Sequence, residues 1–412
     1  MSTRPNVVFI EQFYFPEGWG GAQIPRDITI EFARAGFQVS VYCGSDQYVS
    51  AGSECAISPA RFGVAIKHIP RYALPHRFGR RMLAQIWFCV LTAASIILRP
   101  KPSVFVVQTN PPLMVVAASW IAAIFRKPLV IIAQDIYPEV MIAHGMIKRE
   151  SIFGRMLTAV FRSAYRSAKC VVSLGPKMTA RLIEKGVFES HTCEIANWAT
   201  GDLTLIRGPT NEIVRDWGLS GKFVLLYSGN LGIAHDVQTM VRAVALVKPT
   251  IPNLRLVIVG AGSRIQETQH LVEELRLQEE VLFAPAVSSR LLPHTLGAAD
   301  LALVTLLPEF NGLVVPSKLL GYMARGLPTL YVGPPDSDVG RIIAISGGGI
   351  SVRNGDVLDL AARITNIAND RASLDRMGAM AADYYRLNLR QDIGLSRYRQ
   401  MLDAVLDEGE PS

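Results

Sequence analysis

The chain has 412 residues, of which 50% are hydrophobic and 19% are charged, with a formal net charge of +7. This composition excludes an extended disordered chain. Because the length exceeds what one hydrophobic core usually fills, we expect two globular domains.

Apolar strand-like runs alternate with helical segments along almost the whole chain, a pattern typical of parallel sheets wound by crossover helices. In the first half, strands are predicted at residues 7–10, 38–43, 65–69, 104–108, 129–132 and 170–173. Helices between them include 112–125 and 153–167. In the second half, strands are predicted at residues 223–227, 254–259, 281–283, 301–304 and 329–332. The predicted fold class is therefore α/β, with two Rossmann-like parallel-sheet domains facing a central cleft.

The boundary between the domains is expected at residues 199–211, which are rich in Gly, Thr and Pro and lose the alternating pattern. We expect one domain over residues 1–204 and a second over residues 205–387. Three helical segments follow the last predicted strand, the final one over residues 391–406. Residues 388–412 would then form a C-terminal helical segment that can return to the first domain.

Basic residues flank the apolar run Ala84–Leu98. They are Arg71, Arg77, Arg80, Arg81, Arg99 and Lys101. Such a helix can lie on an anionic membrane surface, where each basic residue adds about 1 kcal/mol. A buried helix with a solvated basic rim explains the pattern equally well. Because the run is shorter than the ~20 apolar residues of a spanning helix, any membrane contact is expected to be peripheral.

The N-terminal residues and the cysteines indicate the cellular compartment in which we expect the protein. The run Asn6–Ile10 is followed at once by Glu11 and a polar loop, so no secretory signal is expected. The five cysteines are odd in number and show no metal-type spacing. We therefore expect a cytoplasmic protein, either free or peripheral at the inner face of the plasma membrane.

Gly20 and Gly21 close the loop after the first predicted strand, before a helix that we expect to begin near Gln23. Glycine here lets backbone N–H groups approach a diphosphate, and the helix N-terminus adds partial positive charge. The loop lacks the GxGxxG pattern of dinucleotide-binding folds. Taken alone, the glycines are explained more readily by a flexible turn.

Two glycine turns follow strands in the second half. Gly229 permits a tight turn, after which Asn230 and His235 could donate hydrogen bonds to phosphate oxygens. Gly260 and Gly262 end the next strand, where a ring or a ribose can lie against the backbone. Structural alternatives stay open, because the residue after His235 can cap a helix and glycines can simply reverse the chain.

The most specific segment contains Pro316, Ser317 and Lys318. Pro316 and Ser317 set a helix start, and a Gly-Leu-Pro sequence at residues 326–328 ends the helix. Lys318 then stands in the first turn, where it opposes the helix dipole at a cost of about 0.3–1 kcal/mol unless an anion lies beside it. The sequence therefore predicts a bound phosphate at this helix.

Two carboxylates, Asp135 and Glu139, follow the strand 129–132. They could bind sugar hydroxyls or an acceptor, because loops at strand ends often carry sites. The alternative is that Asp135 caps a helix and Glu139 is solvated. The sequence Asp336-Ser337-Asp338 is similar to a metal-binding DxD pattern, but helix capping explains it, and no metal is expected.

The segment from Pro316 to Pro328 resembles the donor-site signature of glycosyltransferase family four, P-S-K-x-x-E-Y-M-A-x-G-x-P. Gly20-Gly21-Ala22-Gln23 is similar to the family's N-terminal glycine loop, and residues 228–232 are similar to its strand-turn in the nucleotide domain. The resemblance covers essentially the whole chain, implies the GT-B architecture, and is closest to bacterial transferases that build O-antigen, colanic-acid-like and other exopolysaccharide units.

The resemblance implies a retaining glycosyltransferase of hexosyl or N-acetylhexosaminyl type. It would move a sugar from a nucleoside diphosphate to a polyprenyl-diphosphate-linked or growing glycan acceptor, with UDP favoured over GDP. The first domain would bind the acceptor and the second the donor. The diphosphate would lie along Lys318, the Ser317 N–H and the Gly20-Gly21 loop. The catalytic candidates are Asp135, Glu139 and Lys318. Neither a cofactor besides the donor nor a nucleic-acid partner is expected.

Two departures from the family pattern matter for the donor. Gly321 stands where the family has the second glutamate of its E-x7-E pair, which is expected to bind the donor ribose, and Leu313 stands at the first. Glu309 lies four residues upstream of that position. Asn230 and His235 stand where many members carry an Arg and a Lys on the diphosphate.

Two other functions remain open on the same scaffold. A nucleotide-sugar epimerase would need acid and base carboxylates in the cleft, for which Asp135 and Glu139 are the candidates. A catalytically silent partner of a polysaccharide assembly complex would agree with the glycine at position 321.

Overall fold

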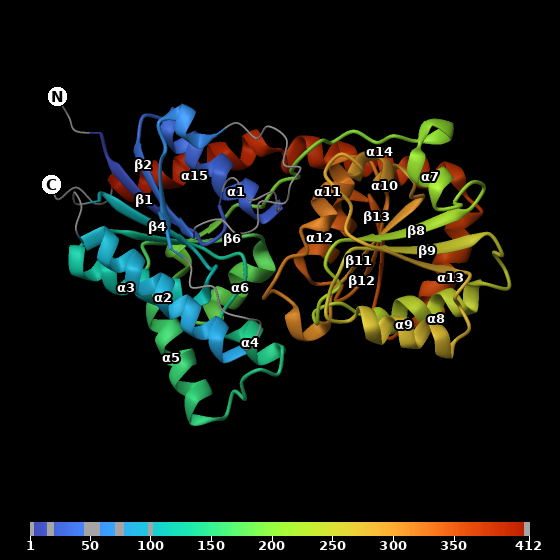
Figure 1. Cartoon of the computed structure of the whole chain (residues 1–412), viewed down its shortest axis with the longest axis horizontal. Helices are drawn as coiled ribbons and strands as arrows, with labels where there is room; N and C mark the ends of the chain where they lie inside the picture. The colour runs from blue at the N-terminus through green and yellow to red at the C-terminus, as the bar shows by residue number, and fades with distance from the viewer. Residues whose placement is uncertain (1–3, 15–19, 45–57, 71–77, 98–101, 408–412) are drawn as a thin grey trace. The chain divides into compact units, whose positions relative to one another are not determined.

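Parallel strands covered by helices on both faces form each half of the chain (Figure 1). The computed structural model describes residues 4–14, 20–44, 58–70, 78–97 and 102–407. The chain divides into two units. The first comprises Met1–Ala196 and Gln391–Ser412, and the second comprises Asn197–Arg390.

The sheet of the first unit has the strand order β3-β2-β1-β4-β5-β6-β7. Its strands are β1 (Asn6–Ile10), β2 (Gln38–Gly44), β3 (Ala65–Ile69), β4 (Val104–Gln108), β5 (Leu129–Ile132), β6 (Cys170–Ser173) and β7 (Thr192–Glu194). Its helices are α1 (Gly20–Arg34), α2 (Phe78–Ile97), α3 (Pro112–Phe125), α4 (Glu139–Ala143), α5 (Ile152–Ser167), α6 (Pro176–Glu184) and α15 (Gln391–Asp407). Helices α1 and α15 lie on one side of this sheet and α2, α3 and α5 on the other (Figure 1).

The sheet of the second unit has the strand order β10-β9-β8-β11-β12-β13. Its strands are β8 (Phe223–Ser228), β9 (Leu254–Val259), β10 (Val281–Ala284), β11 (Leu301–Thr305), β12 (Thr329–Val332) and β13 (Gly349–Val352). Its helices are α7 (Glu212–Asp216), α8 (Val237–Val247), α9 (Ile265–Glu274), α10 (Leu292–Gly297), α11 (Lys318–Ala324), α12 (Asp338–Ser346), α13 (Val357–Ala368) and α14 (Arg371–Asn388).

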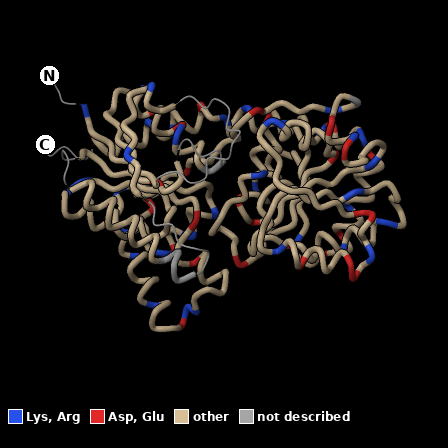
Figure 2. The backbone as a smooth tube through the Cα atoms, in the orientation of Figure 1, with Lys and Arg blue, Asp and Glu red and all other residues tan. Residues whose placement is uncertain are grey.

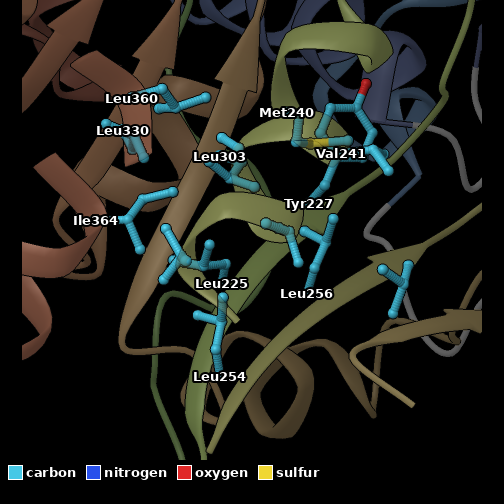
Figure 3. Packing of buried hydrophobic residues seen from close by; sticks show 14 of the residues in the cluster. Leu225, Tyr227, Met240, Val241, Leu254, Leu256, Leu303, Leu330, Leu360 and Ile364 are labelled. Carbon is cyan, nitrogen blue, oxygen red and sulfur yellow. The ribbon is translucent and has the colours of Figure 1, made fainter. Parts of the chain in front are cut away.

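The central strands are buried along nearly their whole length, as in β4, β6 and β11. Because helices cover both faces of a parallel sheet, such strands read as continuous apolar runs. In the second unit, Leu225, Leu256 and Leu303 from adjacent strands pack with Leu360 and Ile364 of α13 (Figure 3). This core fixes the strand ends that carry the site.

Each sheet reverses its strand order once, between β1 and β4 in the first unit and between β8 and β11 in the second. At such a point the loops that follow the two strands diverge and leave a crevice at the carboxyl ends of the strands, where ligands of α/β proteins bind. We therefore expect ligands to bind at the loops after β1, β4, β8 and β11.

The predicted α/β class with two parallel sheets is confirmed. The pattern does not predict β7 and β13, because these edge strands have only three and four residues and are only partly buried. Helix α1 begins at Gly20, about one turn before the expected start at Gln23, so Gly20 and Gly21 belong to the helix. Loop residues 15–19 lie outside the described ranges.

The C-terminal helix α15 belongs to the first unit, where it packs against α1. Gln391 Nε2 at its start donates to Asp27 Oδ2 at 2.7 Å. The division between the units falls after Ala196, whereas the first domain was expected to end at residue 204, eight residues later.

Among the described residues, no helix combines the length and the apolar character needed to cross a bilayer. Helix α2 contains the apolar run 84–97. Of the basic residues that flank this run in the sequence, Arg71, Arg77, Arg99 and Lys101 lie outside the described ranges.

Candidate functional site

The ammonium group of Lys318, the first residue of α11, lies among neutral acceptors of the second unit. Its Nζ donates to Tyr227 Oη at 3.0 Å and to the Asn230 carbonyl oxygen at 3.2 Å. It also lies 3.5 Å from His235 Nε2 and 4.7 Å from the centre of the Tyr227 ring. In the described part of the chain, no carboxylate pairs with this ammonium group.

Burial sets the charge of these groups. It lowers the pKa of Lys318 to about 8, so the ammonium form predominates at neutral pH. It raises the pKa of Tyr227, so the phenol stays neutral. The Tyr227 hydroxyl therefore accepts from Lys318 and donates its proton to the Asn230 carbonyl oxygen at 2.8 Å. The dipoles of neutral groups hold the positive charge of Lys318 in place, and a bound anion would neutralise this charge.

His235 accepts where the sequence suggested a donor. Its Nδ1 lies 2.9 Å from the Thr305 carbonyl oxygen, which can only accept, so Nδ1 carries the proton and Nε2 presents a lone pair to Lys318. Burial, followed by the charge of Lys318, lowers the pKa of His235 to about 3. The ring is therefore neutral in this state and orients the lysine.

The Asn230 side chain is exposed, and the contacts of this residue to Tyr227 and Lys318 run through its backbone carbonyl. The expected donor role of the Asn230 amide toward a phosphate stays a prediction.

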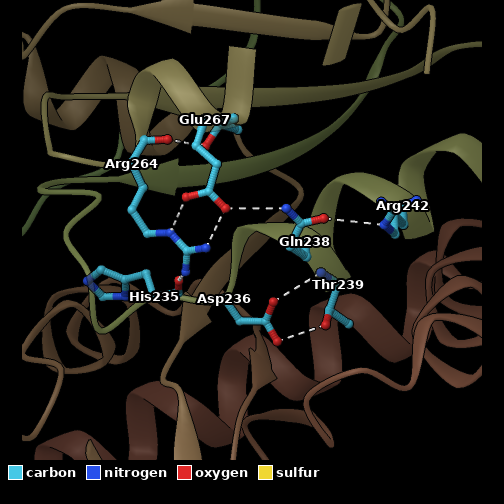
Figure 4. A network of polar contacts seen from close by, with 8 residues as sticks. His235, Asp236, Gln238, Thr239, Arg242, Arg264 and Glu267 are labelled. Atoms are coloured by element: carbon cyan, nitrogen blue, oxygen red, sulfur yellow. Dashed lines mark hydrogen bonds and ion pairs between the residues drawn. The ribbon is translucent and has the colours of Figure 1, made fainter. Parts of the chain in front are cut away.

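A polar network fixes the backbone beside His235 (Figure 4). Arg264 donates to the His235 carbonyl oxygen and makes a bidentate contact with Glu267 at 2.7 and 2.5 Å. Asp236 caps α8 by accepting from Thr239 N at 3.0 Å, which confirms the capping alternative for this residue. The loop after β8 is therefore fixed at two points, by Arg264 at the His235 carbonyl oxygen and by Asp236 at the start of α8.

Three glycines let these loops approach one another. Gly229 has φ +126°, and a Cβ there would lie 2.7 Å from Lys318 Cε. Gly260, at φ +133°, and Gly262, at φ +154°, would place a Cβ into the backbone of Gly229 and Leu231. Only glycine combines these φ values with such close approach. Gly260 and Gly262 thus pack the loop after β9 against the loop after β8, whereas their proposed contact with the donor stays a prediction.

The site lies at the point where the strand order reverses. Tyr227 is the penultimate residue of β8, and Thr305 ends β11, the neighbouring strand. Tyr322 connects α11 to the end of β8, because its hydroxyl accepts from Ser228 N at 3.2 Å. Tyr227, Thr305 and Tyr322 are not predicted as site residues from the sequence. Their places at strand ends or in the motif are readable, but the strand order that brings them together is not.

The start of α11 matches the expected helix start. Ser317 is the N-cap residue, but its side chain makes no capping hydrogen bond, and Leu319 N donates to the Pro316 carbonyl oxygen at 3.4 Å. One turn along the helix, the Gly321 carbonyl oxygen accepts from Arg325 Nη1 at 2.8 Å.

The positions of the family's glutamate pair hold no carboxylate. Leu313 is buried, a Cβ at Gly321 would lie 3.5 Å from Arg325 Nη1, and Glu309 is exposed. The Asp336-Ser337-Asp338 segment begins α12, where Ser337 Oγ accepts from Gly340 N at 3.1 Å. Helix capping therefore explains this segment, as expected.

In the first unit, Asp135 lies in the loop after β5. Its backbone N–H and that of Gln134 donate to Thr109 Oγ1, at 3.2 and 3.1 Å, so this loop is anchored to the end of β4. Burial raises the pKa of Asp135 to about 6, and a hydrogen bond with Tyr137 partly offsets this shift. Asp135 does not cap α4, whose N-cap residue is Pro138.

Glu139 is an ion-pair partner and not a solvated residue. Lys185 Nζ contacts its two carboxylate oxygens at 2.5 and 2.6 Å, and the lysine side chain is only 3% exposed. Lys185 also lies 5.4 Å from the centre of the Tyr165 ring. Glu139 therefore holds the loop, and its expected role on a sugar competes with this pairing.

Two models of known protein families match the chain. The description "Glycosyl transferase 4-like domain" matches residues 20–198, and "Glycosyl transferases group 1" matches residues 210–383. These matches correspond to the two parallel-sheet units. The chain belongs to the family-four glycosyltransferases with the GT-B fold.

Two curated relatives agree with this assignment. "Probable glycosyltransferase WbjE" of Pseudomonas aeruginosa is 26% identical over 341 residues, which cover 81% of this chain and 83% of that protein. "Putative colanic acid biosynthesis glycosyl transferase WcaI" of Escherichia coli K12 is 24% identical over 197 residues, which cover 46% of each protein.

Solved structures share the fold. Anabaena HepE in complex with UDP-glucose superposes with a TM-score of 0.74 at 15% identity, covering 97% of this chain and 99% of that chain. WaaG, a glycosyltransferase involved in lipopolysaccharide biosynthesis, superposes with a TM-score of 0.69 at 19% identity, with the same coverage.

The neutral His235 makes a testable contribution to stability at acid pH. An unfolded histidine has a pKa of about 6.5, whereas His235 in the folded chain has a pKa of about 3. Below about pH 6.5 the unfolded chain binds a proton that the folded chain does not, so stability falls as pH falls. From pH 7 to pH 5 we expect a loss of about 2 kcal/mol from this residue.

Urea unfolding at both pH values measures this loss. His235→Gln should remove it, whereas His270→Gln, on the exposed face of α9, should retain the wild-type slope. Identical pH slopes in the wild type and His235→Gln would contradict the neutral state of the ring.

Proposed function

We propose that the chain is a retaining transferase that moves a sugar from a UDP-sugar to a lipid-linked or growing glycan acceptor in cell-surface polysaccharide biosynthesis. The buried ammonium group of Lys318 is the observation that supports the donor site. It lies at the strand-order reversal of the second unit, and no carboxylate within the described ranges pairs with it. Names of relatives support the pathway, since WcaI is named for colanic acid and WaaG for lipopolysaccharide.

The donor diphosphate binds beside Lys318 in this proposal. The ammonium group has three N–H donors, and the contact with His235 Nε2, at 3.5 Å, is the longest of its three. A phosphate oxygen replaces this weak contact most readily, while Tyr227 and Asn230 keep the lysine oriented. UDP is favoured because HepE, which shares the fold, was solved with UDP-glucose. We propose no cofactor besides the donor.

Catalysis then depends on positioning and on charge stabilisation. Protonated Lys318 stabilises the negative charge that develops on the departing UDP, a type of contact worth about 2.7–4 kcal/mol in other enzymes. Asp135 is largely ionised at neutral pH, because its raised pKa of about 6 still lies below 7. It accepts a hydrogen bond from a hydroxyl of the acceptor or of the sugar. Retention of configuration follows from the family resemblance.

The reaction itself tests the proposal. Melting-temperature shifts with a panel of UDP- and GDP-sugars identify the donor, because a ligand that binds only the folded state raises stability. Incubation of the protein with that donor alone distinguishes a transferase from an epimerase. A nucleoside diphosphate sugar product with inverted configuration at one carbon would contradict a transferase.

Lys318→Ala should lower kcat/KM by about 100- to 1000-fold, because the variant loses a charge that acts on the leaving group. The melting temperature should change little by comparison, since the lysine contributes one buried charge and no apolar core. Lys222→Ala, before β8 and outside the site, is the matched control and should retain activity. Wild-type turnover in Lys318→Ala would rule out the role given to this lysine.

Asp135→Asn should lower kcat by about 10- to 100-fold, because a hydrogen bond to a charged group contributes about 1.5–3 kcal/mol. The wild-type rate should rise with pH around the pKa of about 6 and then level off, and the variant should lose this inflection. Glu139→Gln is the control. It should lower stability, because it leaves buried Lys185 unpaired, and retain the inflection. An unchanged pH profile in Asp135→Asn would refute the assignment.

We also infer peripheral contact with anionic membranes through α2. This helix buries Phe88 and Ile96 but exposes Leu83, Trp87 and Val90, so an apolar face remains uncovered within the described residues. Sedimentation with phosphatidylglycerol vesicles measures the contact. Trp87→Ser/Val90→Ser should reduce the bound fraction several-fold, and full retention of binding by this variant would contradict the contact.

A further inference from the structure

A pocket of about 390 Å³ lies along the first half of α5 and has no part in the site described above. It is lined by Arg149, Glu150, Arg155, Thr158, Ala159 and Arg162. The loop before α5 folds closely onto the helix, because Gly154 is buried and a Cβ there would run into the Lys148 carbonyl oxygen. This fold brings Arg149 beside the two arginines of the helix.

The three arginines of the pocket, Arg149, Arg155 and Arg162, make no ion pair within the described chain. Several arginines elsewhere in the described chain do contact a carboxylate, namely Arg181, Arg215, Arg264, Arg363, Arg371, Arg386 and Arg399. The pocket therefore gathers three guanidinium groups around one carboxylate, an arrangement that a phosphate would stabilise.

Apolar side chains stand exposed beside the pocket, at the first turns of α5. Ile152 is 89% exposed, Phe153 48% and Met156 54%. Helix α3, which packs against α5, exposes Trp120 by 65% and Ile124 by 74%. An uncovered apolar surface next to basic groups suits a ligand with an anionic head and a hydrocarbon chain, and free phosphate would leave this surface unused.

The stretch of sequence that contains the pocket residues is strongly basic. Residues 55–183 contain 18 Lys and Arg against three Asp and Glu, a net formal charge of +15. The rest of the chain contains 24 Lys and Arg against 32 Asp and Glu, a net formal charge of −8. Figure 2 shows basic positions on α5 and on the loop before it. A net positive charge of this size in the sequence favours the binding of anionic ligands.

The pocket lies within electrostatic range of an ion pair that involves the same unit's loop with Asp135. Burial lowers the pKa of Lys185, and the charges of Arg162 and Arg149 lower it further. Lys185 in turn binds Glu139, four residues from Asp135. The pocket and the candidate acceptor-binding residue therefore belong to the same unit and are linked through this ion pair.

We propose that Arg149, Arg155 and Arg162 bind the diphosphate of a lipid that carries the sugar acceptor, with the first part of its hydrocarbon chain against Ile152, Phe153 and Met156. This inference rests on the proposed transferase function and selects a lipid-linked acceptor over a free glycan.

Calorimetric titration with farnesyl diphosphate, below its micelle concentration, tests the site. Saturating UDP is present, so that the proposed donor site is already filled. Wild-type protein should bind farnesyl diphosphate at least 10-fold more tightly than inorganic diphosphate. Arg155→Gln/Arg162→Gln should weaken binding of both probes at least 10-fold. Ile152→Gln/Met156→Gln should weaken binding of farnesyl diphosphate alone.

Arg166→Gln is the matched control, because Arg166 is an exposed arginine of α5 that lies 5.8 Å from the Phe188 ring and does not line the pocket. It should change neither affinity more than 2-fold. Equal affinity for the two probes, or wild-type binding by the double arginine variant, would overturn the proposal. The same holds if that variant loses only its binding to phosphatidylglycerol vesicles, which would identify bilayer lipid as the ligand.

Titration with UDP alone distinguishes a wrong lipid site from a wrong donor site. If UDP binds and farnesyl diphosphate does not, the lipid site is wrong and the donor site stands. If UDP does not bind, the proposed donor site is wrong, and the arginine variants still decide the lipid site.

Discussion

A positive charge held by neutral groups is the interaction on which the second unit's site depends. The Lys318 ammonium group is fixed by the Tyr227 hydroxyl, the Asn230 carbonyl oxygen and the His235 ring. These groups orient the charge without neutralising it, because none of them is a carboxylate. A buried cation of this kind is costly by itself and becomes favourable when an anion arrives. The proposed donor site rests on this imbalance.

The scaffold makes this arrangement possible through backbone geometry. Gly229 leaves room for the lysine chain to cross, and Gly260 and Gly262 let the loop after β9 pack against the loop after β8. The reversal of strand order between β8 and β11 places Tyr227 and Thr305 on adjacent strand ends. The first unit uses the same topology, in which Thr109 at the end of β4 anchors the loop of Asp135.

The helix dipole alone does not explain the surroundings of Lys318. Lys318 does begin a helix, but the protein already supplies it with dipolar partners, so its position alone does not require a phosphate. The more informative fact is that the charge itself has no counterion in the described chain. Likewise, Glu139 is a pairing residue for Lys185, a role that no local pattern indicates, because 46 residues separate the two.

The sequence by itself determined the fold class, most strand positions and the motif around Lys318, because strand periodicity and helix boundaries are local properties of the chain. It also located the glycine turns at Gly229 and Gly260. Only the tertiary structure decided the proton position on His235, the contact of Tyr227 with Lys318, and the clustering of arginines along α5. These features depend on strand order and on burial, which change hydrogen-bond partners and pKa values through residues far apart in the chain.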